Sequence, residues 1–229
     1  MRMAEADLPA TTPRSSAALA GESYHRQITS TPDPVRVRAR FQEQVVAMLA
    51  PGATVLDFGA GTGIDTRFLA ERGHRLQAFE PDAAMVGYLR FHCADLITAS
   101  SVSVVDDMAS VDPVDMIIAD FAVLNLVDDL PATLRRFHAA LKPDGRVIAS
   151  VLNPWAARDM QYGWWWRNVP SLIGRGTYEV GGASGAVRRV SASYLARTAS
   201  PWFRTACLTP AGPARFSHPY LFVRLDRRA

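Results

Sequence analysis

Three glycines at alternate positions carry the clearest chemical signal in the sequence. Gly59, Gly61 and Gly63 directly follow an apolar run at residues 55–58 that is typical of a buried strand. Glycine lets the main chain turn tightly, and it lets a ligand lie against bare backbone where a side chain would collide. The pattern therefore predicts a strand, a ligand-binding loop and a helix that together hold a thin, nucleotide-like cofactor.

An acidic residue at the end of the next predicted strand supports this interpretation. Residues 75–80 end on Glu80, 21 positions after Gly59, where a carboxylate can accept hydrogen bonds from both hydroxyls of a ribose. The dinucleotide fingerprint requires Gly or Ala at its sixth position, but that position is Ile64, and Asp57 stands where dinucleotide sites are usually apolar. A nicotinamide cofactor therefore fits the spacing less well.

Residues 55–63 resemble motif I of the class I S-adenosylmethionine-dependent methyltransferases, and residues 79–85 resemble the end of that family's second strand. The resemblance extends over residues 54–153. It implies S-adenosylmethionine as the cofactor and methyl transfer as the reaction. It also implies an α/β fold with a Rossmann-like, seven-stranded, mostly parallel sheet, helices on both faces and an antiparallel last strand.

The resemblance assigns parts of the cofactor to particular residues. The glycine loop would hold the amino acid end of the cofactor, with its carboxylate near helix N-terminal amides. Asp57 would bind the ammonium group or the N–H groups of the loop, and a buried carboxylate that only ties the turn together is the open alternative. Glu80 would hold the ribose. Two aromatic residues, Tyr24 ahead of the first helix and Phe121 after the fourth strand, would also contact the cofactor.

Adenine contacts are implied at the ends of the second and third strands. Pro81 and Met85 would pack on the adenine faces, as apolar residues of the core also would. After the third strand, the family uses a carboxylate for the exocyclic amine and a neighbouring backbone N–H for the ring. This matches Asp107 best, then Asp106, with Met108 beside them.

Composition limits the class of protein. A chain of 229 residues fits one α/β domain with an N-terminal extension. The net charge of +3 is a mild excess of dispersed arginines, which is typical of a solvated surface and disfavours a nucleic-acid partner. Two cysteines are too few for a disulfide framework, and no apolar run is long enough to cross a membrane. We therefore expect a cytoplasmic protein without a membrane partner.

The order of predicted elements follows the same fold. Residues 1–22 are expected to be a flexible tail, and residues 23–229 a methyltransferase domain. Strands alternate with helices, which is typical of crossovers around a parallel sheet. The predicted strands are residues 54–58, 75–80, 102–105, 115–120, 146–151, 202–208 and 220–225, with helices at 64–72, 82–92 and 131–141 and another beginning near residue 33.

Residues 154–190 depart from this alternation. They contain four of the five tryptophans and then a glycine-rich stretch. We interpret them as a cap, a helical lid followed by a hairpin, inserted after the fifth strand and lying over the mouth of the site. Trp164, Trp165 and Trp166, together with Asn125, are the expected substrate contacts. A flap that completes the core or forms a homodimer contact is the alternative.

Methyl transfer requires little from the protein beyond alignment and desolvation, because the sulfonium is already a strong electrophile. His25 and His218 are the candidate bases, and no cluster has the spacing of metal ligands. The predicted acceptor is a small apolar or aromatic metabolite. An RNA- or protein-directed methyltransferase is one alternative, although residues 119–122 lack the Asn/Asp-Pro-Pro-aromatic motif of enzymes that methylate base amines. A non-catalytic module that binds the cofactor is the other.

Overall fold

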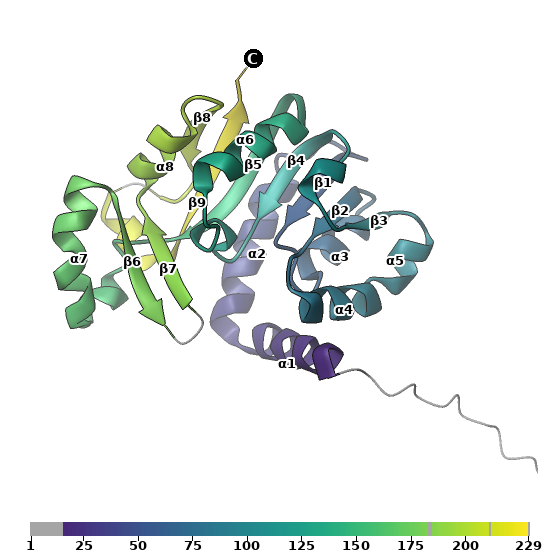
Figure 1. Ribbon diagram of the computed structural model, residues 1–229, viewed down its shortest axis with the longest axis horizontal. Coiled ribbons are helices and arrows are strands. Elements are labelled where there is room, and N and C mark those ends of the chain that lie inside the picture. The colour runs from purple at the N-terminus through teal and green to yellow at the C-terminus, as the bar shows by residue number, and fades with distance from the viewer. Residues whose placement is uncertain (1–15, 183–184, 211, 229) are drawn as a thin grey trace, which may run out of the picture.

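Seven strands form one central sheet in the computed structural model, which describes residues 16–182, 185–210 and 212–228 (Figure 1). The strand order is β3-β2-β1-β4-β5-β9-β8. β9 runs antiparallel to β5 and β8, whereas the pairs among β1 to β5 are parallel. The strands are β1 Thr54–Phe58, β2 Arg75–Phe79, β3 Val102–Val105, β4 Val114–Ala119, β5 Leu141–Leu152, β8 Phe203–Cys207 and β9 Tyr220–Arg227. The predicted seven-stranded, mostly parallel sheet is confirmed.

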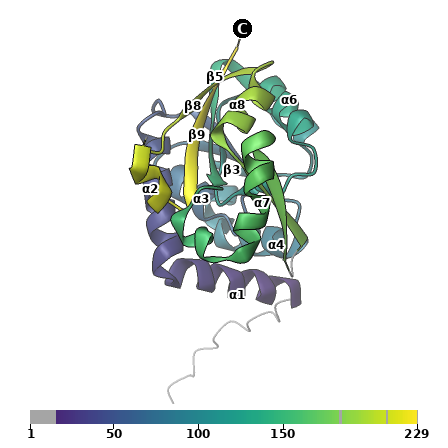
Figure 2. The same cartoon turned by 90° about the vertical axis from the view of Figure 1, so that its left-hand side faces the viewer.

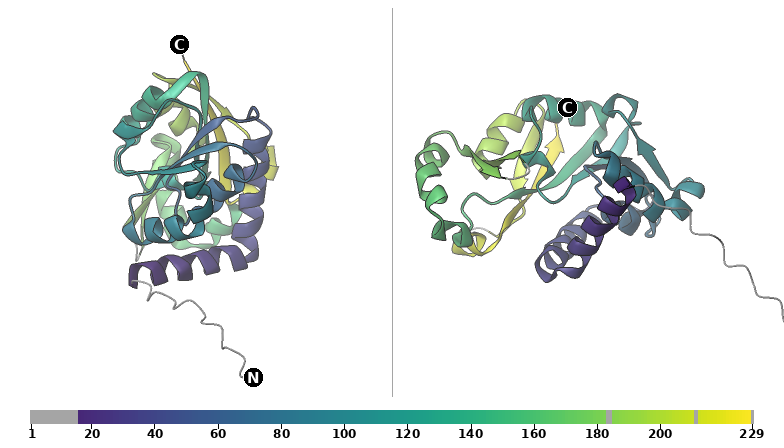
Figure 3. Two further views of the ribbon diagram at one scale, coloured as in Figure 1. Left: turned by 90° about the vertical axis from the view of Figure 1, so that its right-hand side faces the viewer. Right: turned by 60° about the horizontal axis from the view of Figure 1, so that its bottom comes forward.

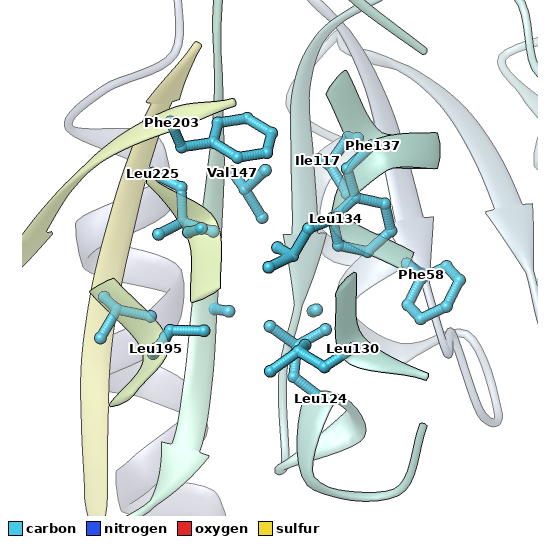
Figure 4. Close-up of a cluster of buried hydrophobic side chains, with 14 of the residues drawn as sticks. Phe58, Ile117, Leu124, Leu130, Leu134, Phe137, Val147, Leu195, Phe203 and Leu225 are labelled. Atoms are coloured by element: carbon cyan, nitrogen blue, oxygen red, sulfur yellow. The ribbon is translucent and has the colours of Figure 1, made fainter. Parts of the chain in front are cut away.

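Helices cover both faces of this sheet because the central strands are apolar on both sides. Leu56 and Phe58 of β1 belong to a core that α6 and α8 cover, whereas Val55 faces a second core beneath α2 and α3 (Figure 4). The α-helices of the sheet domain are α2 Pro32–Val46, α3 Ile64–Ala70, α4 Ala83–His92, α5 Ala94–Thr98, α6 Leu130–Ala140 and α8 Ala192–Ala199. Short 3-10 helices are η1 Met108–Ser110, η2 Val123–Asn125 and η4 Gly212–Ser217.

The strand order reverses between β1 and β4. From β1 the chain builds outward through β2 and β3, then returns to place β4 on the other side of β1. In open parallel sheets this reversal leaves a crevice at the carboxyl ends of the two strands, where ligands bind. The glycine loop follows β1 and Asp120 follows β4, so both flank that crevice.

An additional helix, α1 (Ser16–Ser30), lies beyond the carboxyl ends of the parallel strands and packs along α4 (Figures 1 and 3). The close approach depends on Gly21, because a Cβ there would lie 2.7 Å from the carbonyl oxygen of Ala84 and from the Cβ of Tyr88. Residues 16–22 are therefore helical where the sequence predicted a flexible tail. Gly21 permits close packing of this helix, which composition alone does not distinguish from disorder. The remainder of the predicted tail lies outside the described residues.

The cap follows β5 and consists of η3 (Ala157–Gln161), α7 (Gly163–Gly174) and a hairpin of β6 (Thr177–Gly182) and β7 (Gly185–Val190). This is the helix and hairpin expected after the fifth strand. Figure 2 shows the cap facing the viewer, with α1 below it. The cap and α1 thus lie at the same edge of the sheet, around the crevice.

Residues 142–145, Lys-Pro-Asp-Gly, separate a predicted helix from a predicted strand and are typical of a turn, but in the structure they belong to β5. β5 and β4 pair at Leu141 and again at Arg146, opposite Val114 and Met116, so the extra residues form a bulge. Asp144 adopts a φ of 63° there. The prediction of a turn was correct about the local backbone but wrong about where the strand begins, because pairing with β4 resumes on both sides of the bulge.

Candidate active site

The glycine loop has one position that faces open space. Gly59, Gly61 and Gly63 have φ values of 75°, 55° and 80°, in the left-handed region that favours glycine. A Cβ on Gly59 would lie 2.6 Å from Val123, and one on Gly63 would lie 3.0 Å from Cys93 and Leu89. A Cβ on Gly61 would meet no atom of the described residues within 4 Å. Packing therefore adds to the backbone requirement at two of the glycines, whereas Gly61 combines a positive φ with open space beside the loop that a ligand could occupy.

Glu80 ties this loop to the end of β2. Its Oε2 accepts a hydrogen bond from the Gly61 N–H at 2.8 Å, and its Oε1 accepts one from the Asp82 N–H at 2.9 Å. A carboxylate has about four lone-pair sites, so both oxygens can still accept from ribose hydroxyls. Pro81 is exposed, and Met85 is half-buried in the first turn of α4. Glu80 is thus both a support for the loop and a polar group at its rim.

Asp57 is buried beneath the loop, with 3 % of its surface exposed. Its Oδ2 accepts a hydrogen bond from the Thr66 hydroxyl at 2.6 Å, which joins the end of β1 to α3. Burial, followed by the nearby Asp65 carboxylate, raises the pKa of Asp57 to about 7. This contact supports the alternative in which Asp57 holds the turn together, and the ammonium role stays a prediction.

Two further buried carboxylates lie beside it. Asp65, on the first turn of α3, pairs with the Arg38 guanidinium and accepts from Gln42 Nε2 at 2.8 Å. Asp120, after β4, accepts from the Ser150 hydroxyl at 2.6 Å. Its Oδ2 is buried and has no hydrogen-bond partner within the described parts of the chain. Burial and the Asp65 carboxylate raise the pKa of Asp120 to about 7.

These carboxylates leave the site short of positive charge. Asp57, Asp65 and Asp120 are all less than 9 % exposed, and Arg38 is the cation paired with one of them. A buried anion needs a counter-charge or a proton. The ammonium and sulfonium groups of S-adenosylmethionine would supply positive charge here, and the unpartnered Asp120 Oδ2 is suited to an ammonium N–H. The residues therefore fit this cofactor.

Tyr24 and His25 reach the site from α1. Burial raises the pKa of the Tyr24 hydroxyl, which also lies in the electrostatic field of Arg38, Glu80 and Asp120, although 40 % of the residue is exposed. His25 Nδ1 lies 3.0 Å from the Thr62 hydroxyl in the glycine loop. Burial and Arg38 lower the pKa of His25, so the ring is neutral at pH 7. Tyr24 thus lies within α1 and not ahead of the first helix, and its contact with the cofactor stays a prediction, whereas His25 fastens α1 to the loop.

Three of the residues predicted to contact adenine follow β3. Asp107 accepts from the Ala109 N–H at 3.0 Å and caps η1. Asp106 is exposed and lies 3.8 Å from Arg90. Met108 is buried in the core that includes Phe58. Asp107 therefore faces the rim in an ordered loop, whereas the Met108 side chain serves the core.

Phe121 and Asn125 differ in role. Phe121 has a φ of 51°, and its ring lies 4.5 Å from the Arg38 guanidinium and 5.8 Å from the Tyr220 ring. Asn125 is 1 % exposed, and its amide is used by the fold. It accepts from the Leu152 N–H at 3.0 Å and donates to the Arg188 carbonyl at 2.5 Å. The prediction of Asn125 as a substrate contact gives way to a role in fixing the cap.

The three adjacent tryptophans of α7 face three different environments. Trp165 is 4 % exposed and donates to the Pro154 carbonyl at 2.8 Å, so it belongs to the interior of the cap. Trp166 is 62 % exposed. Trp164 is half-buried against Tyr162, with ring centroids 5.9 Å apart. Successive helix positions are about 100° apart, so the three rings cannot all face the same way. Trp165 is therefore not available as a substrate contact, whereas contact by Trp164 and Trp166 stays a prediction.

His218 lines a hollow of about 300 Å³ that it shares with Arg40, Glu43 and Tyr220. Among the described residues, no group of three or more His, Cys, Asp or Glu side chains is placed to hold a metal. In the same part of the chain, no helix combines the length and the hydrophobicity that a membrane span requires.

Donor affinity is expected to rise between about pH 6 and pH 8, by up to about tenfold per pH unit for each carboxylate, because Asp57 and Asp120 must lose protons to face a cation. Their raised pKa values of about 7 place the change there. The pH dependence of folding stability without ligand has the opposite sign. The folded state keeps the protons of Asp57 and Asp120 to higher pH than the unfolded chain does, so the stability that they contribute is lost as pH rises from about 4 through 7. Calorimetry in buffers of different ionisation enthalpy would detect proton release.

Asp120→Asn separates the contribution of Asp120 to this pH dependence from that of His25, whose pKa is also shifted, downward. The variant is expected to bind the donor more weakly and to release fewer protons. A wild-type protein whose donor affinity is constant over this range would contradict the charge argument.

Comparison with known proteins agrees with this geometry. The family described as a methyltransferase domain matches residues 32–178. The chain therefore belongs to the methyltransferase family, and its fold is that of the class I S-adenosylmethionine-dependent methyltransferases.

Individual relatives are more distant. An uncharacterised methyltransferase of Geobacillus kaustophilus is 28 % identical over 134 residues, which covers 56 % of this chain and 60 % of that protein. Among solved structures, 1,6-didemethyltoxoflavin-N1-methyltransferase of Burkholderia thailandensis, with bound 1,6-didemethyltoxoflavin and S-adenosylhomocysteine, is 21 % identical with a TM-score of 0.61, covering 98 % and 94 % of the two chains. A chain from the complex between the Haloferax volcanii Trm112 methyltransferase activator and a methyltransferase is 16 % identical with a TM-score of 0.64, covering 95 % and 100 %.

Proposed function

We propose that this protein transfers a methyl group from S-adenosylmethionine to a small molecule that enters between α1 and the cap. The observation that carries the proposal is the cap itself. Its hairpin is fastened to the crevice by Asn125, which bonds both β5 and β7. A site bounded by a cap on one side and a helix on another favours a small acceptor over an extended polymer surface.

The donor would be held by the residues around the reversal of strand order. Its amino acid end would lie against Gly61 and the buried carboxylates, with Asp120 Oδ2 accepting from the ammonium group. Glu80 would accept from the ribose hydroxyls, and Asp107 would lie at the adenine end. S-adenosylmethionine supplies an electrophilic methyl group on a sulfonium. The protein's contribution is then to align the acceptor and exclude water.

Aromatic residues would border the place of transfer. Tyr24, Phe121 and Tyr220 come from α1, the loop after β4 and β9, and they converge near Asp120. Burial raises the pKa of both tyrosine hydroxyls, so they remain protonated donors at neutral pH. Neither predicted base fits well: His25 is bonded to Thr62, and His218 lines a hollow with residues of α2 and with Tyr220. We infer that the acceptor reacts without a histidine base.

A direct test measures methyl transfer from radiolabelled S-adenosylmethionine. The purified protein would be incubated separately with a fractionated small-metabolite extract, total RNA and a protein extract. Label in the small-molecule fraction is the expected result. Label in RNA or protein would favour the alternative of a macromolecular substrate, and donor binding with no label in any fraction would favour a non-catalytic module.

A further inference from the structure

The interior of the cap contains three buried polar atoms that lack hydrogen-bond partners in the described part of the chain, two of which, Asp159 Oδ2 and Arg189 Nη1, form an ion pair with each other. The Tyr178 hydroxyl, Asp159 Oδ2 and Arg189 Nη1 are buried, and none has a hydrogen-bond partner among the described residues. Asp159 and Tyr178 are each 5 % exposed. The large majority of buried polar atoms in proteins are hydrogen-bonded. Three exceptions in one small region indicate that a polar group completes them.

These side chains come from different elements of the cap and converge. Tyr178 and Arg189 are directly opposite each other in the hairpin, so their side chains share one face. Asp159 approaches from η3, and its Oδ2 lies 3.2 Å from Arg189 Nη1 without the alignment of a hydrogen bond. The Trp164 ring lies 6.4 Å from the Tyr178 ring and 5.8 Å from the Arg189 guanidinium. The cluster therefore combines hydrogen-bond donors, an acceptor and a flat apolar surface.

Tyr220 connects the polar cluster with the residues that would hold the donor. Burial raises the pKa of Tyr220, and its hydroxyl lies in the electrostatic fields of Asp120 and Tyr24 as well as those of Arg158 and Arg189. Asp120 and Tyr24 belong to the donor side, whereas both arginines belong to the cap. Tyr220 also contacts Phe121, with ring centroids 5.8 Å apart. The polar cluster thus lies on the acceptor side of the proposed site.

We propose that Asp159, Tyr178 and Arg189 bind the methyl acceptor, and that this acceptor carries a planar group with adjacent N–H and C=O functions, as in a lactam-type heterocycle. Asp159 would accept from the N–H, and Arg189 and Tyr178 would donate to the C=O. The Trp164 ring would provide a flat surface for the heterocycle. This inference rests on the proposed function and specifies its substrate class, replacing an apolar acceptor with one that has a polar edge.

Binding of uracil and of pteridinedione is the test, measured by thermal shift and tryptophan fluorescence on the full chain saturated with S-adenosylhomocysteine. Dimethyluracil, in which both ring N–H groups are blocked, and naphthalene are the matched controls. We expect at least one N–H/C=O heterocycle to bind and both controls to fail, because a site built to hydrogen-bond a group strongly rejects the analogue that lacks it.

Tyr178→Phe distinguishes a ligand site from a structural cluster. Removing an unpartnered buried hydroxyl is expected to leave the melting temperature of the unliganded protein unchanged or raised, while heterocycle affinity falls by at least about tenfold. Asp159→Asn is expected to weaken the same ligands and spare S-adenosylhomocysteine. Glu179→Gln, on the exposed side of the same hairpin, is the control and should change neither.

The outcomes separate this inference from the proposed function. Failure of the wild-type protein to bind S-adenosylhomocysteine would refute the proposed function. Normal binding of S-adenosylhomocysteine without binding of any N–H/C=O heterocycle would overturn the acceptor inference alone. Equal heterocycle affinity in wild type and Tyr178→Phe would also overturn it, because water would then suffice as the partner of the hydroxyl.

Discussion

Gly61→Arg is expected to abolish binding of S-adenosylmethionine and of S-adenosylhomocysteine, with an affinity loss of about 100-fold or more. A Cβ at Gly61 meets no described atom within 4 Å, so the arginine would extend into the space that the donor needs. The fold should persist, because the cost is that of a side chain at a φ of 55°, about 1 kcal/mol. Titration calorimetry and chemical denaturation measure the two effects.

Gly52→Arg is the matched control. Gly52 has a φ of 71°, and an added Cβ would meet no atom of the described residues within 4 Å. It precedes β1, at the end of the strand opposite to the glycine loop. Gly52→Arg should therefore lower the free energy of unfolding about as much as Gly61→Arg does, without weakening donor binding. Gly63→Ala, in contrast, should mainly destabilise the fold, since its Cβ would lie 3.0 Å from Cys93 and Leu89. Undiminished donor affinity in Gly61→Arg would show that the donor does not lie along this loop.

Glu80→Ala is expected to weaken donor affinity by at least about tenfold, because hydrogen bonds to a charged group are worth roughly 1.5–3 kcal/mol each and water replaces them only in part. The variant also removes the acceptor of the Gly61 N–H, so the loop loses a constraint along with its ribose contact. Glu80→Gln keeps a carbonyl acceptor and should be intermediate.

The ribose contact can be separated from the support of the loop with a second ligand. Wild type should bind S-adenosylhomocysteine more tightly than its deoxyribose analogue, and Glu80→Ala should bind both with similar affinity. A variant that still discriminates between them as wild type does would show that another group reads the ribose hydroxyls.

The parts of the site that could be predicted from sequence lie close together along the chain. The glycine loop and Glu80 occupy the ends of two successive strands, and their spacing reflects a local unit whose geometry is nearly independent of the rest of the protein. Tyr24 was anticipated only through the resemblance. Arg38 and Asp65 were not anticipated as a pair, since the two residues are on separate helices and become neighbours only when α2 and α3 pack on the same face. Asp120 showed one signal, an acidic residue at the end of an apolar strand.

By itself, the sequence determined the order of the seven strands of the sheet, the glycine loop with its acidic partner, and hence the family and its donor. These follow from the periodicity of apolar residues and from local backbone requirements. Only the tertiary structure decided that Trp165 is buried while Trp166 is exposed, that Asn125 is a brace for the cap, and that unpartnered polar atoms of Asp159, Tyr178 and Arg189 converge. The physical reason is that burial and hydrogen bonding depend on which elements pack together. The sequence around a residue does not indicate which distant residues it will contact.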